Sequence, residues 1–184
     1  VDIVMMRTFK QADIEEFAEH SKVPVINGLS DDFHPCQLLA DIQTFMEFRG
    51  TLEGQTVAWI GDGNNMCQSW IHASMLLDFD LKIACPEGFE PNQQLTSLAK
   101  DRVTISQSPQ TADRGANLVT TDVFASMGQE DQRQLRLTQF SDFKVDHNLM
   151  SLAAEGALFM HCLPAHRNEE VTGELLAVSY THLR

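Results

Sequence analysis

Four short polar segments of the sequence carry side chains that can bind or transfer charged groups. One is Gly61-Asp62-Gly63-Asn64-Asn65, another runs from Asp122 through Ser126-Met127-Gly128, and a third is His161-Cys162-Leu163-Pro164. The fourth, His34-Pro35-Cys36-Gln37, opens a candidate helix, whose N-terminus attracts anions. Asparagine amides suit a polar ligand, and carboxylate, imidazole and thiol groups can exchange protons. Arg7 ends the first apolar run and adds a cation, so the set suits a small polar or anionic ligand.

Each of these residues also has a purely structural explanation. Asp122 could cap a short helix, and His34 could hydrogen-bond to the start of its own helix. Arg7 could belong to a surface ion pair, and Cys162 could be a small buried hydrophobic residue. A ligand site becomes the better explanation only if the four segments meet in one place, which depends on the elements that carry them.

Apolar runs typical of strands alternate with segments of helical spacing from Thr56 onward. The run Thr56–Ile60 predicts a buried strand, and Met66–Leu77 after it predicts a helix. The other strand candidates are Leu81–Cys85, Val103–Ser106, Asn117–Thr120 and Ala157–His161. The other helix candidates are Gln94–Lys100, Pro109–Gly115, Gln129–Gln139 and Asp146–Glu155, the last with Asp146 as N-cap and Gly156 just past its end.

The alternation predicts the α/β class, with a doubly wound parallel sheet covered by helices on both faces. Ligands of such sheets bind beyond the carboxyl ends of the strands. Three of the four polar segments directly follow predicted strands, so we expect them to converge at one edge of the sheet.

Residues before Thr56 follow a different pattern. Ile3–Met6 and Val23–Ile26 predict short strands with a helix over Asp13–His20 between them, and Pro35 at the first helical position leads into Leu38–Phe48. A strand at the very start of the chain suggests a second α/β domain that is cut. We therefore expect a remnant of that domain over 1–33, an interdomain helix over 34–50, the main domain over 51–176 and a tail over 177–184.

Composition limits the classes of partner. The 184 residues include 13 Lys and Arg against 26 Asp and Glu, a formal charge of −13, which argues against nucleic acid. A hydrophobic fraction of 43% with 21% charged residues is typical of a globular chain with a real core. No apolar run approaches the roughly 18–20 residues that span a bilayer, and the first residues lack the order of a signal peptide. We expect neither a nucleic-acid nor a membrane partner.

The cysteines argue for a reducing compartment and against a metal. Cys36, Cys67, Cys85 and Cys162 are scattered, without a CxxC pair, so free thiols in a cytosol-like compartment are the simplest interpretation. Histidines adjoin Cys36 and Cys162, but structural zinc sites usually draw on paired ligands at short spacing. We expect no metal.

A dinucleotide site is the alternative for the first polar segment. Gly61-x-Gly63-x-x-Met66 matches two glycines of GxGxxG and fails at the third, and Glu87 could serve as the ribose acid. Asn64 and Asn65 are better suited to a polar ligand, so NAD stays the second hypothesis.

The four segments closely resemble motifs of the ornithine carbamoyltransferase family. The resemblance rests on Asn27–Asp31 leading into HPCQ (34–37), on WIGDGNN (59–65), on Asp122 with SMGQE (126–130) and on HCLPAHR (161–167). Several spaced motifs in one order, over about residues 1–172, are far more specific than any one of them. The SMG and HCLP segments favour this family over the related aspartate carbamoyltransferases.

The resemblance implies a two-domain enzyme with a Rossmann-like ornithine-binding domain, usually a homotrimer, that needs no cofactor. It would transfer the carbamoyl group of carbamoyl phosphate to the δ-amine of ornithine, giving citrulline and phosphate, in arginine biosynthesis or the urea cycle. By motif match, carbamoyl phosphate would contact Arg7, His34 and Gln37. Ornithine would contact Asn65, Asp122, Ser126, Met127, Cys162 and Leu163. Asp122, Cys162, Arg7 and His34 would take part in catalysis.

The sequence departs from the family pattern in two places. The family's phosphate-binding Ser-x-Arg-Thr-Arg does not occur in it, and Ala177–Arg184 is unlike the family's continuation. We therefore expect negligible catalysis by this chain alone, with a non-catalytic ornithine-binding remnant as the alternative. HPCQ and HCLPAHR favour a bacterial and hence cytoplasmic protein; a eukaryotic source would place it in the mitochondrial matrix.

Overall fold

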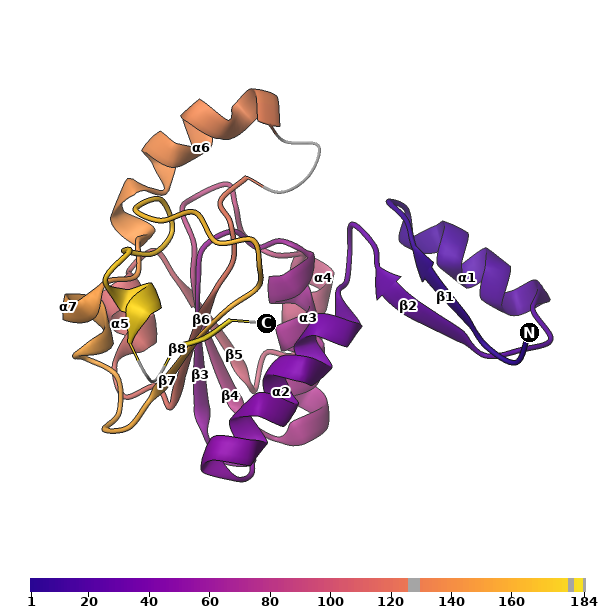
Figure 1. Ribbon diagram of the computed structural model, residues 1–184, viewed down its shortest axis with the longest axis horizontal. Coiled ribbons are helices and arrows are strands. Elements are labelled where there is room, and N and C mark those ends of the chain that lie inside the picture. The colour runs from indigo at the N-terminus through magenta and orange to yellow at the C-terminus, as the bar shows by residue number, and fades with distance from the viewer. Residues whose placement is uncertain (126–129, 179–180, 184) are drawn as a thin grey trace.

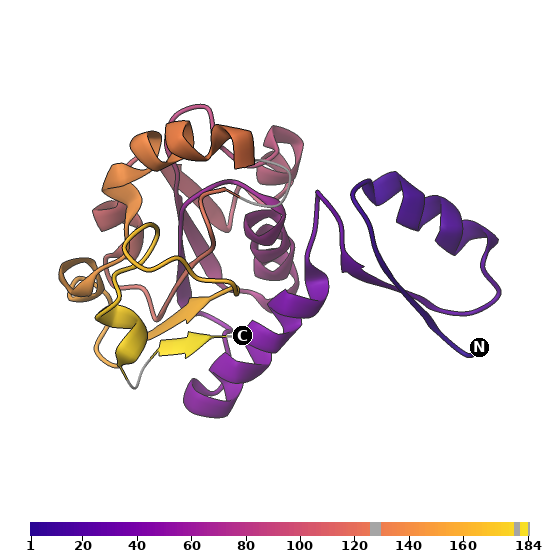
Figure 2. The same cartoon turned by 45° about the horizontal axis from the view of Figure 1, so that its top comes forward.

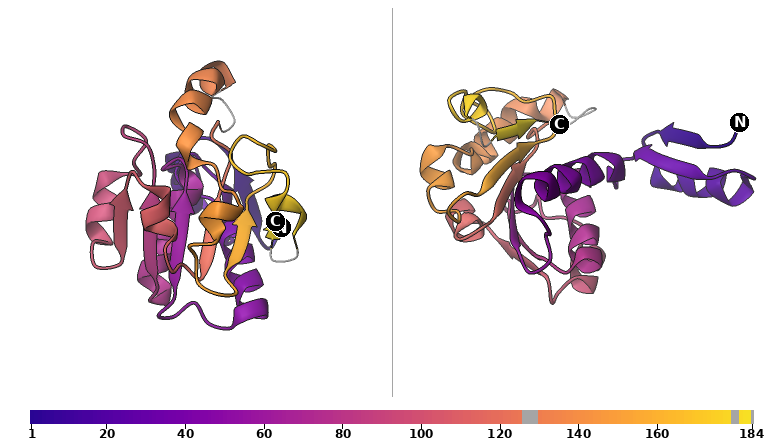
Figure 3. Two further views of the ribbon diagram at one scale, coloured as in Figure 1. Left: turned by 90° about the vertical axis from the view of Figure 1, so that its left-hand side faces the viewer. Right: turned by 60° about the horizontal axis from the view of Figure 1, so that its bottom comes forward.

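The computed structural model describes residues 1–125, 130–178 and 181–183, which form a large α/β domain and a small N-terminal unit (Figure 1). The unit consists of β1 (Val4–Arg7), α1 (Gln11–His20) and β2 (Val25–Leu29), and α2 (Pro35–Arg49) joins it to the large domain. β1 and β2 pair in parallel, Val4 opposite Val25, with α1 as the crossover. In the right-hand view of Figure 3 the unit extends away from the large domain beyond the start of α2.

The large domain is built on a six-stranded sheet in the order β5-β4-β3-β6-β7-β8, and every pair of neighbours is parallel. Its strands are β3 (Thr56–Ile60), β4 (Asp80–Ala84), β5 (Val103–Ser106), β6 (Leu118–Thr121), β7 (Leu158–His161) and β8 (Thr181–Leu183). Its helices are α3 (Asn65–Leu77), α4 (Gln93–Leu98), α5 (Pro109–Asp113), α6 (Arg133–Gln139) and α7 (His147–Met150), with 3₁₀ turns at Glu130–Gln132, Ser141–Phe143 and Leu175–Ala177. The predicted doubly wound parallel sheet is confirmed.

Two hydrophobic cores lie on opposite faces of this sheet. On one face, Leu38 and Phe45 of α2 and Trp70 of α3 pack against alternate residues of the strands, such as Trp59. On the other face, strand residues such as Ile60 pack against the segments around α5, α6 and α7. Figure 2 shows α6 crossing above the sheet on this second side. Because β3 and β7 are buried on both faces, their sequences are almost continuously apolar rather than alternating.

The helix predicted over Asp146–Glu155 is wrong in length. Asp146 does cap it, accepting from the Leu149 amide at 2.8 Å, but α7 ends at Met150. After that point the backbone bonds to the segment before β6: the Gly115 amide donates to the Leu152 carbonyl, and the Ala154 amide donates to the Ala116 carbonyl. Gly156, with φ of 76°, lies in the turn that leads into β7 instead of at a helix end.

Three other helices are shorter than predicted, and β8 was not predicted. α4 ends at Leu98 instead of Lys100, α5 ends at Asp113 instead of Gly115, and α6 begins at Arg133 after a 3₁₀ turn. The position of Gln129 lies outside the described residues. Within the described residues, no helix is both long and apolar enough to cross a membrane.

Candidate active site

The loops after β3 and β6 meet at the point where the strand order of the sheet reverses. β3 pairs with β4 on one side and with β6 on the other, so the connections leave it in opposite directions. A crevice at the carboxyl ends of the strands forms at such a reversal. Asn64, after β3, and Asp122, after β6, face each other there, with Asn64 Nδ2 donating to Asp122 Oδ2 at 3.0 Å.

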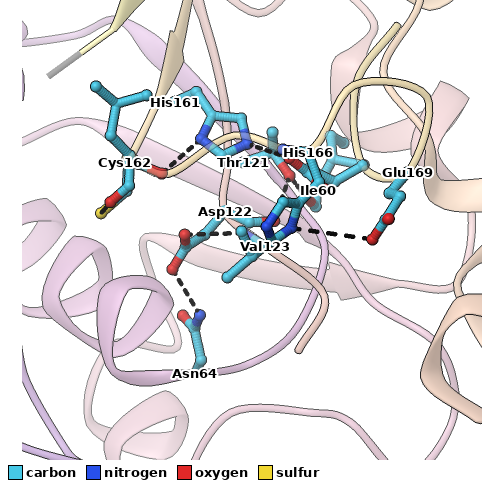
Figure 4. Close-up of polar contacts among 11 residues, drawn as sticks. Ile60, Asn64, Thr121, Asp122, Val123, His161, Cys162, His166 and Glu169 are labelled. Carbon is cyan, nitrogen blue, oxygen red and sulfur yellow. Dashed lines mark hydrogen bonds and ion pairs between the residues drawn. The ribbon is translucent and has the colours of Figure 1, made fainter. Parts of the chain in front are cut away.

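Asn64 both donates to Asp122 and caps the N-terminus of α3. Its Oδ1 accepts the amides of Met66 and Cys67 at 3.0 and 3.1 Å, which is the N-cap arrangement. With the oxygen committed to the helix, the NH₂ group is oriented toward the carboxylate of Asp122 (Figure 4). The cap therefore fixes the direction of the bond that holds Asp122.

Asp122 is a buried carboxyl group, 9% exposed. Burial raises its pKa to about 6, although His161, the Val123 amide that donates to Oδ1 at 2.8 Å and the bond from Asn64 oppose the rise. A carboxylate with this pKa is ionised at neutral pH and still able to take up a proton. It can bind a cationic amine and exchange a proton with it.

Cys162 follows β7 and lies beside Asp122. Burial raises the pKa of its thiol well above the ordinary value, and the charges of Asp122 and Asp41 add to the rise. The sulfur is therefore a protonated thiol at neutral pH, not a thiolate nucleophile. Figure 4 shows Asp122, Val123, His161 and Cys162 gathered where β6 and β7 end.

A buried pair behind Cys162 holds the end of β7. His161 Nδ1 lies 2.6 Å from the Cys162 carbonyl oxygen, and its Nε2 lies 2.9 Å from Glu170 Oε1. Both side chains are fully buried, and the backbone amide of His166 also donates to Glu170 Oε1. The pair fixes the backbone that presents Cys162 and Leu163.

A pocket of about 410 Å³ unites these residues with the N-terminal unit. Arg7 and His34 enter its wall from one side, and Asn65, Asp122, Cys162 and Leu163 enter from the other. Six of the nine predicted site residues therefore converge. The remaining lining residues are Thr8, Phe9, Leu29, Asp31, Val123 and Pro164.

The ring of His34 has a nitrogen, Nδ1, that could donate or accept a further hydrogen bond. Its backbone amide donates to Ser69 Oγ at 2.8 Å, and the residue lines the pocket. Nδ1 is buried and has no partner among the described residues. Burial, followed by the charge of Arg7, lowers the pKa of the ring, so it is neutral at neutral pH.

The other three predicted residues are not in the pocket wall. Gln37 lies one turn into α2, and its Nε2 donates to Asp41 Oδ1 at 2.9 Å. Ser126 and Met127 lie outside the described residues. Asn65 does line the pocket, but its Nδ2 donates to the Ser30 carbonyl at 2.7 Å, so it also joins the N-terminal segment to α3.

Sequence reasoning missed Asp62, Arg136, Glu170 and the apolar part of the pocket wall. Asp62 was noted only as a loop residue, yet its Oδ2 accepts from Arg136 Nη1 at 2.7 Å in a pair whose side chains are 10% and 9% exposed. Pairing over 74 residues has no local signal. Glu170, nine residues after His161, had none either.

The geometry of the first loop argues against a dinucleotide. A Cβ on Gly63 would lie 2.2 Å from the Pro91 nitrogen, and the Gly63 amide donates to the Phe89 carbonyl at 2.9 Å. The segment around Phe89–Pro91 therefore covers the place where a pyrophosphate would approach. Met66, in place of the third glycine, is buried in the core.

The doubly wound sheet with a pocket at its reversal point defines a class of parallel α/β ligand-binding domains. The family model of the aspartate/ornithine carbamoyltransferase Asp/Orn binding domain matches residues 53–182, and that of the carbamoyl-P binding domain of the same family matches residues 1–47. The chain belongs to the aspartate/ornithine carbamoyltransferase family, which confirms the resemblance drawn from the motifs.

The relatives that resemble it are ornithine carbamoyltransferases. The anabolic ornithine carbamoyltransferase of Pseudomonas aeruginosa is 59% identical over 176 residues, which cover 96% of this chain and 58% of that protein. The ornithine carbamoyltransferase of Methylococcus capsulatus is 58% identical, over 96% of this chain and 59% of that protein. The chain thus spans a little under three fifths of the length of these relatives.

Solved structures of the family superimpose closely. The ornithine carbamoyltransferase of Pyrococcus furiosus matches with a TM-score of 0.93 at 40% identity, covering 100% of this chain and 61% of that one. The Burkholderia thailandensis enzyme matches with a TM-score of 0.90 at 46% identity, covering 100% of this chain and 59% of that one.

Proposed function

We propose that the protein to which this chain belongs is an ornithine carbamoyltransferase, which transfers the carbamoyl group of carbamoyl phosphate to the δ-amine of ornithine and yields citrulline and phosphate. The observation that carries the proposal is the pocket in which Asp122 and Cys162 face Arg7 and His34. Relatives named ornithine carbamoyltransferase, at 54–59% identity, support ornithine over aspartate as the acceptor.

The two sides of the pocket have complementary charge for the two substrates. Arg7 and His34 line the side of the pocket where carbamoyl phosphate would present its phosphate and carbonyl oxygens. Transfer passes through a tetrahedral oxyanion, and fixed donors stabilise the charge as it develops. Gln37 would join this set if its amide left Asp41.

On the other side, ornithine meets Asp122, Asn65, Cys162 and Leu163, with Ser126 and Met127 as further ligands. The carboxylate of Asp122 binds an amine of ornithine. The δ-amine, like the side-chain amine of lysine, has an ordinary pKa of about 10.4, so it must lose a proton before it attacks, and Asp122 is the acceptor we assign. The Cys162 thiol, kept protonated by burial, orients the amine without forming a covalent intermediate. Much of the acceleration comes from holding the two substrates in register.

The assembly and the setting of the protein are part of the same proposal. We propose a homotrimer in the cytoplasm, as the motif resemblance implies. We also propose that it serves arginine biosynthesis, which the names of two anabolic relatives support. We further propose that residues 1–33 belong to the carbamoyl phosphate domain, 34–50 to the interdomain helix and 51–176 to the ornithine domain, with 177–184 as a C-terminal tail that adds β8 to the sheet of that domain. The 184 residues alone bind ornithine with negligible transfer, because the Ser-x-Arg-Thr-Arg loop is not among them.

The test begins with the encoding nucleic acid, sequenced across both ends of this chain. The protein of the complete reading frame is then assayed with carbamoyl phosphate and either ornithine or aspartate. Citrulline with ornithine, and no carbamoylaspartate with aspartate, is the expected result. No citrulline from the complete protein, combined with ornithine binding by calorimetry, would instead favour the non-catalytic ornithine-binding alternative.

A further inference from the structure

A second group of charged side chains lies behind the active site, in the segment that follows HCLP. His166, Glu169 and Glu170 each place one potential ligand atom within 4.8 Å of the other two. We propose that these three side chains form a binding site for a divalent transition-metal ion of the Zn²⁺ type. The proposed function does not use this site.

The geometry is close to what a zinc ion requires. Zinc bonds of about 2.0–2.2 Å to nitrogen and oxygen place the ligand atoms of a tetrahedral centre about 3.4 Å apart. His166 Nδ1 and Glu169 Oε2 are 3.9 Å apart, and Figure 4 shows the two side chains facing each other. Their side chains are 42% and 24% exposed, so both have room to close the remaining distance and an ion can reach them.

The hydrogen bonding of Glu170 supports a bound cation separately from the distances between the three side chains. Its side chain is fully buried, and Oε1 is already occupied by His161 Nε2 and the His166 amide. Oε2 is also buried and has no hydrogen-bond partner among the described residues. A buried carboxylate oxygen without a partner is costly, and a bound cation removes that cost.

The charged groups next to His166 and Glu169 are compatible with a bound cation. Glu169 pairs with Arg133, but the arginine side chain is 46% exposed, and an exposed pair contributes little to stability. The other oxygen of Glu169 faces His166. The net charge of −13 also raises the local concentration of cations.

The donor set selects the kind of ion. An imidazole nitrogen with two carboxylate oxygens suits Zn²⁺ and Co²⁺, whereas Mg²⁺ and Ca²⁺ prefer oxygen ligands alone. Three protein ligands leave a position open for water.

The test uses the untagged 184-residue chain with Cys36, an exposed thiol, replaced by serine in every sample. Zn²⁺ alone is titrated by calorimetry, and Co²⁺ is followed by absorption spectroscopy. The variants are His166→Asn and Glu169→Gln, whose side chains are both partly exposed, so the fold tolerates the changes. His20→Asn is the matched control, because His20 is also an exposed histidine with glutamates on its helix.

We expect one equivalent of Zn²⁺, a melting temperature that rises with Zn²⁺, and a loss of affinity of at least about tenfold in both variants but not in His20→Asn. Co²⁺ should give visible d–d bands without the intense near-ultraviolet band of a thiolate ligand, and excess Mg²⁺ should not displace it. Unchanged affinity in both variants, a thiolate band, or no stoichiometric binding would each overturn the site.

Discussion

Asp122 combines three properties at the residue scale: it is buried, it is held by Asn64 and the Val123 amide, and it has a raised pKa. A carboxylate of this kind binds a cationic ligand strongly only when it is ionised. Under the proposed function, its charge therefore determines how the affinity for ornithine depends on pH.

The first prediction concerns ornithine binding by the 184-residue chain. Replacing Asp122 by Asn removes a charge-assisted hydrogen bond worth about 1.5–3 kcal/mol, so the affinity should fall roughly 10- to 150-fold by calorimetry. Because the pKa of Asp122 is raised to about 6, binding to the unsubstituted chain should also weaken as the pH falls through about 6. Asp142→Asn, at an exposed aspartate, is the control and should change neither quantity. An equal affinity in Asp122→Asn and Asp142→Asn would exclude Asp122 as a ligand.

A second prediction concerns Asp113, which has no role in the site. Its carboxyl group is fully buried, both oxygens lack partners among the described residues, and burial raises its pKa to about 7 from 3.8. The folded chain therefore holds the proton more tightly than the unfolded chain. The stabilisation that the protonated carboxyl group contributes is therefore complete below about pH 4. This contribution, at most about 4 kcal/mol of unfolding free energy, is lost as the pH rises from about 4 to about 7.

Asp113→Asn removes this titration. Its free energy of unfolding relative to the parent chain should increase between about pH 4 and pH 8, measured by urea denaturation at each pH. Asp101→Asn, at an exposed aspartate, should show a constant difference. If the Asp113→Asn difference is also constant, the pKa of this carboxyl group is the same in the folded and the unfolded chain.

At the scale of the element, α6 is attached to the site by Arg136. Nη1 donates to Asp62 Oδ2 at 2.7 Å and to the Phe124 carbonyl at 3.0 Å, and the guanidinium lies 4.9 Å from the centre of the Phe89 ring. One side chain thus joins α6 to the loop after β3 and to the segment after β6. Arg133, on the same helix, forms an exposed pair with Glu169 and is a natural comparison.

Arg136→Met should cost about 3–5 kcal/mol of unfolding free energy, because it leaves the charge of Asp62 buried without its partner. Arg133→Met should cost under about 1 kcal/mol. Adding Asp62→Asn to Arg136→Met should recover part of the loss. Equal losses in the two arginine variants, measured by urea denaturation, would show that burial of the Arg136 pair has no energetic consequence.

A comparison of the N-caps of α3 and α4 can distinguish an effect on stability from an effect on ornithine binding. Asn64 and Asn92 each accept two backbone amides at the start of their helix. Both Asn64→Ala and Asn92→Ala should therefore lose about 1 kcal/mol. Only Asn64→Ala removes the bond to Asp122, so only it should weaken ornithine binding and change its dependence on pH. A similar loss of ornithine affinity in Asn92→Ala would mean that the effect is general destabilisation.

The hydrophobic pattern of the sequence predicted helices and strands well where burial of apolar side chains determines the structure. It predicted them poorly where backbone hydrogen bonds to a distant segment replace those of a helix. Thr56–Ile60 matches β3 residue for residue, because a buried parallel strand is a continuous apolar run. Val103–Ser106 also matches β5, although two of its four residues are exposed. The helix after Asp146 was predicted too long, because the Ala116 carbonyl takes the Ala154 amide. The convergence of Asp122 and Cys162 followed from sheet topology. The partners of Asp62 and Glu170 did not, since nothing in the local sequence indicates a distant partner.

At the scale of the whole molecule, the N-terminal unit depends on its attachment to α3. Among residues 1–33, Ile14 is the single buried hydrophobic side chain, and two strands with one helix cannot bury enough apolar surface to be stable alone. Residues 30–34 are bound to α3 by three side chains. Asn65 donates to the Ser30 carbonyl, Gln68 donates to the Asp32 carbonyl at 3.0 Å, and Ser69 Oγ accepts the His34 amide. These bonds also fix His34 relative to Asp122, so they align the two sides of the pocket.

Removing Gln68 and Ser69 together, as Gln68→Ala/Ser69→Ala, should therefore loosen the N-terminal unit and leave the six-stranded sheet intact. The variant also loses the bonds from the Asn92 amide to Gln68 and from Ser69 to the Asn65 carbonyl, which lie within the large domain. The two lost bonds to residues 30–34, at about 1 kcal/mol each, correspond to roughly 30-fold faster hydrogen exchange of amides in residues 4–29, with no change in β3, β4 and β6. Ser74→Ala is the control, because its hydroxyl bonds only to the Ile71 carbonyl within α3. If exchange in the double variant rises equally in the unit and in the sheet, the bonds stabilise the whole fold. If it rises in neither, other contacts hold the unit in place. Selective exchange in the unit alone is the result that makes α3 the element aligning His34 and Arg7 with Asp122.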